Sequence, residues 1–181
     1  MNRTLTLRLM NTPGRAEIAR QAVIALAVRV GMPPLAADRA GFNVAAVIAE
    51  CDDEDVSILA EIVVPADAEM LTVCRMVLMG VGAGLPLTDE ALDDLKLVLS
   101  EACASAIEHT PDAGGTVEIA FRTSDAELEV SVSDHGRGAE TAIGGLGFGM
   151  PLLRQLCSRL DVAPRADAPG TVVRFAQSLP A

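Results

Sequence analysis

Apolar residues recur along most of the chain at intervals that predict alternating strands and helices. From residue 58 to residue 64 a short β-rich run ends at Pro65. Asp67 is then expected to cap a helix whose apolar stripe consists of Met70, Val73, Val77 and Val81. Thr88, followed by Asp89 and Glu90, predicts the start of a second helix. The buried stripe of that helix is Leu92, Leu95, Val98, Leu99, Ala102 and Ala106.

The second half of the chain predicts two strands, a helix and a last strand. Apolar residues alternate with polar ones over residues 117–121 and again over 128–132, across a turn at Ser124 and Asp125, which predicts a β-hairpin. A glycine-rich connection over 136–149 then leads into a predicted helix with Leu152, Leu153, Leu156 and Leu160 on one side. Residues 170–175 predict the last strand. This order favours an α+β fold, a two-layer sandwich with a mixed sheet covered on one face by helices.

The first 55 residues suggest a second copy of the strand-helix-helix unit. Leu5 to Leu9 predicts a strand, and the helical pattern of residues 16–30 resembles that of residues 68–81. In this alignment Glu50 falls near the position of Glu101. We therefore divide the chain into residues 1–55, a degenerate repeat or a chance similarity, and residues 56–181. The first segment is expected to pack on the sheet or to build a dimer interface.

Composition excludes several classes of protein. The net charge of −11 opposes binding to a phosphate backbone, so direct nucleic-acid binding is disfavoured. No apolar stretch reaches the roughly 20 residues that a membrane helix needs, and no export signal is visible. The four cysteines are widely spaced, which argues against a metal cluster or a disulfide framework. No phosphate-binding loop of the GxxxxGK[ST] type occurs, so a bound nucleotide would need a different cradle.

Three polar residues of the second predicted helix are spaced by four: Glu101, Ser105 and His109. This spacing places them in one line beside the buried stripe. A carboxylate, a hydroxyl and an imidazole are therefore expected at the edge of the core, facing the sheet. An ordinary solvated helix face has the same pattern, so the line is informative only together with other motifs.

Two glycine-containing segments follow the hairpin. Asp134 comes directly after a predicted strand and precedes Gly136 and Gly138. A carboxylate there can accept a hydrogen bond from an exocyclic amine, and the glycines let the backbone approach a planar ligand. Gly144 to Gly149 directly precedes a predicted helix, where free backbone N–H groups suit a polyphosphate. A simple turn and a flexible surface loop are the alternatives.

Together, and in this order, these segments resemble the GHKL superfamily of ATP-binding proteins. Residues 100–109 resemble its N-box, residues 134–138 the first glycine box, residues 145–149 the second and Gly170-Thr171 the final motif. The resemblance is strongest to the anti-sigma-factor serine kinase branch. It implies the Bergerat-type ATP-binding fold, with ATP or ADP and Mg²⁺ as ligands.

The resemblance also implies a role for each matching residue. Glu101 would be the general base, and Asp134 would read the adenine amino group. Further nucleotide contacts would come from Ser105, His109, Gly136, Gly138 and Thr171. The phosphates would be wrapped by Gly145, Leu146, Gly147, Phe148 and Gly149. Since phosphoryl transfer relies on positioning and charge neutralisation, Mg²⁺ is expected to be indispensable.

Ser105 departs from the family pattern, because the N-box has an asparagine there that ligates Mg²⁺. A serine hydroxyl can ligate Mg²⁺, but it is shorter, so the ion or a bridging water would have to move. The segment Ala139 to Ile143 is also short for an ATP lid and contains no lysine or arginine. Both departures favour a binding role and leave serine/threonine kinase activity open.

Two functions therefore remain. The first is a cytoplasmic ATP-binding anti-sigma regulator, expected as a homodimer, that binds a sigma factor, a STAS-type anti-anti-sigma protein or both. Such a regulator would phosphorylate its STAS partner on serine. The second is a catalytically impaired interaction module whose nucleotide site is vestigial. A sensor histidine kinase core fits less well, because no dimerisation helix with a phosphoacceptor histidine precedes the domain.

Overall fold

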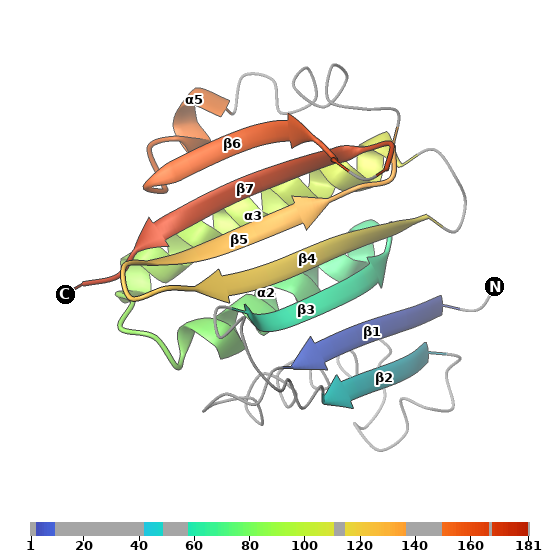
Figure 1. Ribbon diagram of the computed structural model, residues 1–181, viewed down its shortest axis with the longest axis horizontal. Coiled ribbons are helices and arrows are strands. Elements are labelled where there is room, and N and C mark those ends of the chain that lie inside the picture. The colour runs from blue at the N-terminus through green and yellow to red at the C-terminus, as the bar shows by residue number, and fades with distance from the viewer. Residues whose placement is uncertain are drawn as a thin grey trace.

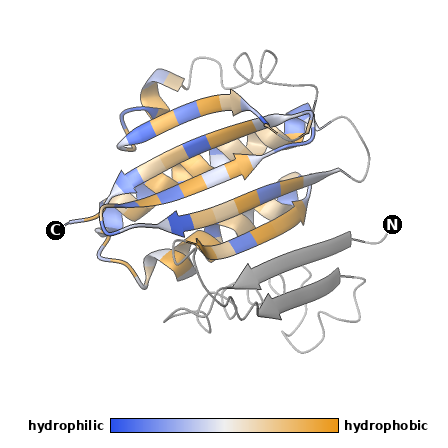
Figure 2. Cartoon of the chain, viewed as in Figure 1, coloured by the Kyte–Doolittle hydropathy of each residue, from blue (hydrophilic) through white to orange (hydrophobic). Residues whose placement is uncertain are grey.

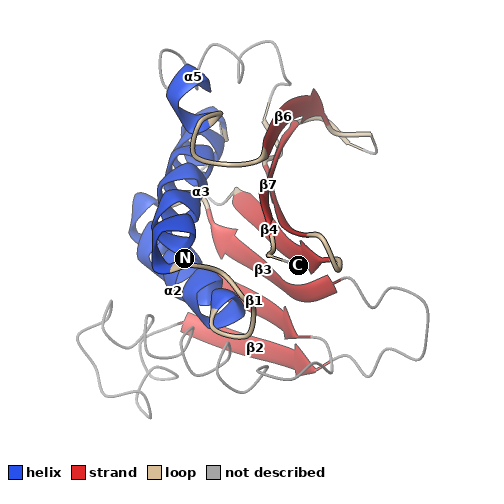
Figure 3. Cartoon of the chain, turned by 90° about the vertical axis from the view of Figure 1, so that its left-hand side faces the viewer, coloured by secondary structure: helices blue, strands red, loops and turns tan. Residues whose placement is uncertain are grey.

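A computed structural model describes residues 3–9, 42–48, 58–110, 115–136, 150–166 and 168–180. Seven strands in these ranges form one sheet, and the helices cover one of its two faces (Figures 1 and 3). The elements are, in chain order, β1 (Arg3–Leu9), β2 (Phe42–Ile48), β3 (Ile58–Pro65), η2 (Ala68–Met70), α2 (Leu71–Gly82), α3 (Asp89–His109), β4 (Thr116–Thr123), β5 (Glu127–Ser133), α5 (Met150–Leu153), β6 (Arg159–Pro164) and β7 (Thr171–Ser178). The α+β sandwich is confirmed.

The sheet is mixed, with the strand order β2-β1-β3-β4-β5-β7-β6. Strands β1 and β2 run parallel, and every other neighbouring pair runs antiparallel. The predicted hairpin is β4 and β5, in which Ile119 lies opposite Val132. Strand β7 then returns beside β5, with Val172 opposite Ser133. The ends of β5 and the beginning of β7 therefore meet at one edge of the sheet.

Period-two alternation decides which face of the sheet is buried. On β4 the side chains of Val117, Ile119 and Phe121 are buried, whereas Glu118 and Arg122 are half-buried on the other face. Figure 2 shows hydrophobic and hydrophilic residues alternating in the same way along strands β3 to β7. Because successive side chains of a strand point to opposite faces, the core lies between the sheet and helices α2 and α3.

Both helices begin where the sequence predicts. The Asp67 carboxylate accepts a hydrogen bond from the Glu69 N–H at 3.0 Å, and α2 follows after a turn of 3₁₀ helix. The Thr88 hydroxyl accepts a hydrogen bond from the Ala91 N–H at 3.1 Å at the start of α3. Each cap satisfies a backbone N–H that has no partner within the helix.

Two cysteines belong to the core between α2 and α3. Cys74 and Cys103 are each 1% exposed. A hydrogen bond with Cys74 and burial both raise the pKa of the Cys103 thiol well above its usual value. Cys103 is therefore held as a thiol and packs as a small apolar side chain.

The predicted helix after the glycine-rich connection is much shorter than expected. Only Met150–Leu153 is α-helical, and Leu160, assigned to the same helix, lies in strand β6. Leu160 is opposite Phe175 of β7 and is buried there. The spacing of the leucines fits a helix, but pairing with β7 lets the chain bury Leu160 and satisfy its backbone. Tertiary pairing outweighs local pattern here.

The predicted repeat of the strand-helix-helix unit also differs from the structure. Strand β1 lies where the first strand is expected, but Phe42–Ile48 forms strand β2 where the second helix of the repeat is expected. A short apolar run cannot be assigned to helix or strand by periodicity alone. Residues 10–41, which include the first expected helix, lie outside the described residues.

Within the described ranges, none of the helices combines the length and apolarity that crossing a bilayer requires.

Replacing Thr88 with alanine tests the cap of α3. We expect Thr88→Ala to lower the free energy of unfolding by about 1 kcal/mol, because the Ala91 N–H loses its acceptor. Urea unfolding followed by circular dichroism measures the change. Thr72→Ala, in the exposed first turn of α2, is the matched control. Its hydroxyl accepts only a long hydrogen bond of 3.4 Å from Arg75, so its loss should change stability much less. An equal loss in both variants would contradict the capping role.

Candidate functional site

The centre of the site is Asp134, at the point where β5 ends beside the start of β7. The backbone N–H of Asp134 donates to the carbonyl of Thr171 at 3.0 Å, which extends the β5–β7 ladder by one bond. Asp134 is 4% exposed and Thr171 is 2% exposed. The candidate site is therefore anchored on two neighbouring strands of a rigid sheet.

The Asp134 carboxylate is held by one of its two oxygens. Oδ1 accepts hydrogen bonds from the backbone N–H of Gly136 at 2.7 Å and of Thr171 at 3.2 Å. Oδ2 makes no hydrogen bond or ion pair with any residue in the described ranges. A buried carboxylate oxygen requires a donor, so this side chain is suited to accept a hydrogen bond from a ligand.

Two glycines allow the close packing around Asp134. A Cβ added at Gly136 would overlap the carbonyl oxygen of His109, so the turn lies directly against the end of α3. Gly170 has φ of 130°, and a Cβ there would overlap the carbonyl oxygen of Asp134. Only glycine adopts this backbone conformation without strain. From the sequence, Gly170 belongs to the final family motif, Gly170-Thr171, in which only Thr171 is predicted to contact the nucleotide.

Helix α3 contributes Ser105 and His109 to the same region. The His109 Nδ1 atom lies 2.7 Å from the Ser105 carbonyl oxygen and 3.4 Å from the Ser105 hydroxyl. A carbonyl can only accept, so Nδ1 carries the proton and Nε2 of the neutral ring is an acceptor. Ser105 is 7% exposed and His109 is half-buried. The two predicted residues are thus in contact.

Glu101 lies two helical turns before His109 on α3. Its side chain is exposed, and it forms no hydrogen bond or ion pair with the described residues. A carboxylate without a partner is available to accept a proton or to orient a hydroxyl.

The remaining predicted contacts fall outside the described residues. These are Gly138 of the first glycine box and Gly145, Leu146, Gly147, Phe148 and Gly149 of the second. Their role in wrapping phosphates remains a prediction. The sequence contains no signal for Glu118 and Arg165. They contact each other near Asp134 because the long Arg165 side chain, just after β6, reaches Glu118 of β4 on the same sheet.

Comparison with known proteins identifies the family. The model of the histidine kinase-like ATPase domain matches residues 64–177, and the chain belongs to this family. The match includes the described site residues Glu101, Ser105, His109, Asp134 and Thr171. The resemblance to GHKL proteins stated from the motifs is confirmed.

Within this family, the chain is similar to proteins named serine-protein kinase RsbW. Serine-protein kinase RsbW of Bacillus subtilis is 38% identical over 78 residues, which are 42% of this chain and 49% of that protein. The protein of the same name from Halalkalibacterium halodurans is 32% identical over 77 residues, 42% of this chain and 48% of that protein. The chain therefore spans about half the length of the curated relatives it matches.

Among solved structures, the histidine kinase domain of the blue-light activated histidine kinase from Erythrobacter litoralis EL346 was found. It has 17% sequence identity and a TM-score of 0.44, covering 93% of this chain and 76% of that chain.

Substitution of Gly170 tests its close approach to Asp134. We expect Gly170→Ala to destabilise the protein by about 1–3 kcal/mol, because alanine at this φ is strained and its Cβ would displace the Asp134 carbonyl. Urea unfolding measures the loss. Gly84→Ala, at an exposed residue after α2 without positive φ, is the control and should change stability much less. Equal effects would show that the contact with Asp134 is not tight.

Proposed function

We propose that the chain binds ATP and ADP, and that Asp134 recognises adenine. The observation that carries the proposal is the buried carboxylate with one oxygen held by backbone N–H groups and the other without a described partner. The exocyclic amine of adenine would donate to Oδ2. Guanine has a carbonyl in the corresponding position, and two acceptors facing each other repel.

The residues around Asp134 fit a nucleotide. Thr171 places its backbone beside the carboxylate, and the packing at Gly136 brings the end of α3 to the same place. We assign Ser105 as the protein ligand of Mg²⁺ in place of the family asparagine. Mg²⁺ bound to nucleotides keeps several waters and phosphate oxygens, so a single protein oxygen is enough to hold it. Bound Mg²⁺ would neutralise charge on the phosphates.

We further propose that the chain is a serine-protein kinase of the anti-sigma type. Two observations support this: relatives named serine-protein kinase are 32% and 38% identical to the chain over 77 and 78 residues, and Glu101 has a carboxylate without a described partner. Glu101 would accept the proton of a substrate serine as its oxygen bonds to the γ-phosphorus, while the bond from that phosphorus to the β–γ bridging oxygen breaks and ADP leaves. The substrate would be a STAS-type anti-anti-sigma protein, and a sigma factor the second partner. The kinase would act as a cytoplasmic homodimer.

The isosteric variant Asp134→Asn tests adenine recognition. Asparagine keeps an acceptor for the Gly136 and Thr171 N–H groups, but replaces Oδ2 with an amide that only donates. We expect the affinity for MgADP to fall at least about tenfold with little change in the unfolding of the free protein. Isothermal titration calorimetry measures the affinity. Asp125→Asn, in the exposed hairpin turn, is the matched control and should bind as the wild type does.

Thermal unfolding gives an independent measure of binding. MgADP at 100 times its dissociation constant should stabilise the wild-type protein by about 2.7 kcal/mol. No stabilisation at millimolar MgADP would exclude the nucleotide site and leave the interaction module as the function. If Asp134→Asn binds MgADP with wild-type affinity, the nucleotide site stands, but Asp134 does not recognise adenine.

Transfer of phosphate tests the kinase. The protein, Mg²⁺ and radiolabelled ATP are incubated with the STAS-domain proteins of the same organism, and phosphoserine is sought. Glu101→Gln should slow transfer by about 100-fold or more while MgADP affinity stays unchanged, because the base acts only in the chemical step. Glu108→Gln, on the exposed face of α3, is the control and should transfer at the wild-type rate.

Two outcomes in this assay decide the kinase assignment. Nucleotide binding without transfer to any STAS protein would refute the kinase and keep the binding role. Ser105→Asn should raise both Mg²⁺ affinity and the transfer rate, because the amide oxygen reaches further than the hydroxyl. A lower Mg²⁺ affinity in this variant would reject Ser105 as the ligand.

A further inference from the structure

Three charged or titratable side chains form a cluster next to the turn of residues 134–136. Glu118 comes from β4, His135 follows β5 and Arg165 follows β6. The Glu118 carboxylate has one oxygen 3.1 Å from His135 Nε2 and the other 3.3 Å from Arg165 Nη1. Arg165 Nη1 also lies 3.3 and 3.5 Å from the two ring nitrogens of His135. Each of the three residues therefore contacts the other two.

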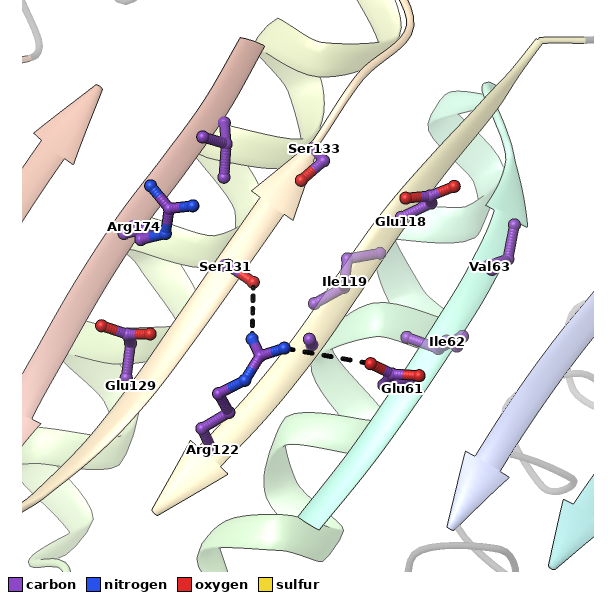
Figure 4. Close-up of a pocket in the computed structure, with 12 residues that line it drawn as sticks. Glu61, Ile62, Val63, Glu118, Ile119, Arg122, Glu129, Ser131, Ser133 and Arg174 are labelled. Carbon is purple, nitrogen blue, oxygen red and sulfur yellow. Dashed lines mark hydrogen bonds and ion pairs between the residues drawn. The ribbon is translucent and has the colours of Figure 1, made fainter. Parts of the chain in front are cut away.

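The cluster lies on the face of the sheet without helices. Glu118 lines a groove with a volume of about 750 Å³ on that face, together with Ser133 and Glu61 (Figure 4). The Asp134 carboxylate is buried on the other side, against the end of α3. The sheet itself therefore separates the cluster from the candidate nucleotide site.

The backbone connects the cluster to the site at three points. Glu118 is opposite Ser133, the residue before Asp134. His135 lies between Asp134 and Gly136 in the turn that holds Oδ1. Arg165 donates its backbone N–H to the Gly170 carbonyl at 3.1 Å, and its side chain packs beside Gly170. Of the residues that hold Asp134, Gly136 directly follows His135, and Thr171 directly follows Gly170, which contacts Arg165.

The chemistry of the three side chains determines which of them donates and which accepts each hydrogen bond. Arginine only donates, so a ring nitrogen of His135 must accept where it faces Arg165. His135 Nε2 can then donate to Glu118, which accepts from both partners. The Arg165 side chain is 13% exposed, whereas those of Glu118 and His135 are each 41% exposed. Because the Arg165 guanidinium is largely buried, its position is the most restricted of the three. Its hydrogen bonds involve charged groups and are therefore stronger than bonds between neutral groups.

We propose that Glu118, His135 and Arg165 are positioning residues for adenine recognition. They hold the end of β5 and the turn before β7 at a fixed separation, so that the Asp134 carboxylate keeps its place beside Thr171. This inference rests on the proposed nucleotide site and adds to it a determinant of specificity on the opposite face of the sheet. Glu118 is its central member, because it contacts both other residues.

A second acid–arginine contact on the same sheet provides a matched control. Glu129 of β5 lies 2.8 Å from Arg159 Nη2 of β6. Figure 4 shows Glu129 on the same groove as Glu118, but towards its other end. Glu129→Gln therefore removes the same charge from the same face without touching the Asp134 turn.

Glu118→Gln tests the proposal through nucleotide discrimination. The dissociation constants of MgADP and MgGDP are measured by calorimetry for wild type, Glu118→Gln and Glu129→Gln, with the thermal unfolding of each free protein. In Glu118→Gln we expect MgADP affinity to fall roughly tenfold, the lower end of the loss when a residue that supports a binding side chain without touching the ligand is replaced. The preference for ADP over GDP should fall with it, because a displaced Asp134 no longer selects the amine. Glu129→Gln should keep both.

A pair of variants at His135 supplies a second readout. His135→Gln retains a donor for Glu118 and an acceptor for Arg165, so it should keep most of the preference for ADP. His135→Ala has neither and should lose it. Because His135 is well exposed, both variants are expected to fold.

The outcomes separate this inference from the function on which it rests. If the wild type binds no MgADP, the nucleotide site itself is wrong and the positioning role falls with it. If the wild type binds but Glu118→Gln keeps the same preference for ADP, only the positioning role is refuted. Equal losses of MgADP and MgGDP affinity with a lower unfolding temperature would assign the cluster to stability alone and also refute it.

Discussion

One buried carboxylate determines the arrangement of this protein's site. Asp134 Oδ1 accepts from the backbone N–H groups of Gly136 and Thr171, and these two bonds fasten the end of β5 to the start of β7. An ionised carboxylate is costly to bury unless donors surround it. Backbone donors supply this at little entropic cost, because the sheet already orders them. The second oxygen has no partner among the described residues, so it is the part of the group that a ligand can use.

Helix α3 and the neighbouring strands hold the Asp134 carboxylate in place. Helix α3 begins at a capped threonine, packs its apolar stripe on the sheet and ends with His109 against Gly136. Since a Cβ at Gly136 or Gly170 would overlap a neighbouring carbonyl oxygen, helix and strands approach as closely as backbone atoms allow. The match to the histidine kinase-like ATPase family, over residues 64–177, includes both this helix and these strands.

The two faces of the sheet have different tasks in the function we propose. The helix-covered face holds the apolar core and the residues assigned to the nucleotide. The other face carries charged residues in a groove, among them Glu118 with its contacts to His135 and Arg165. Because a sheet is stiff across its strands, contacts on this outer face can fix backbone positions on the inner one. Specificity at Asp134 would then depend on side chains that never touch the ligand.

The sequence by itself determined the elements with local signals: the caps at Asp67 and Thr88, the stripes of α2 and α3, the β4–β5 hairpin and the ordered motifs that define the family. These signals act within a few residues, so neighbours in the chain are enough to define them. The tertiary structure alone decided that Leu160 belongs to a strand and that Phe42–Ile48 pairs with β1. It also placed Arg165 beside Glu118, 47 residues away in the chain. Strand pairing and cross-strand ion pairs depend on which segments the sheet brings together, and no local pattern records that choice.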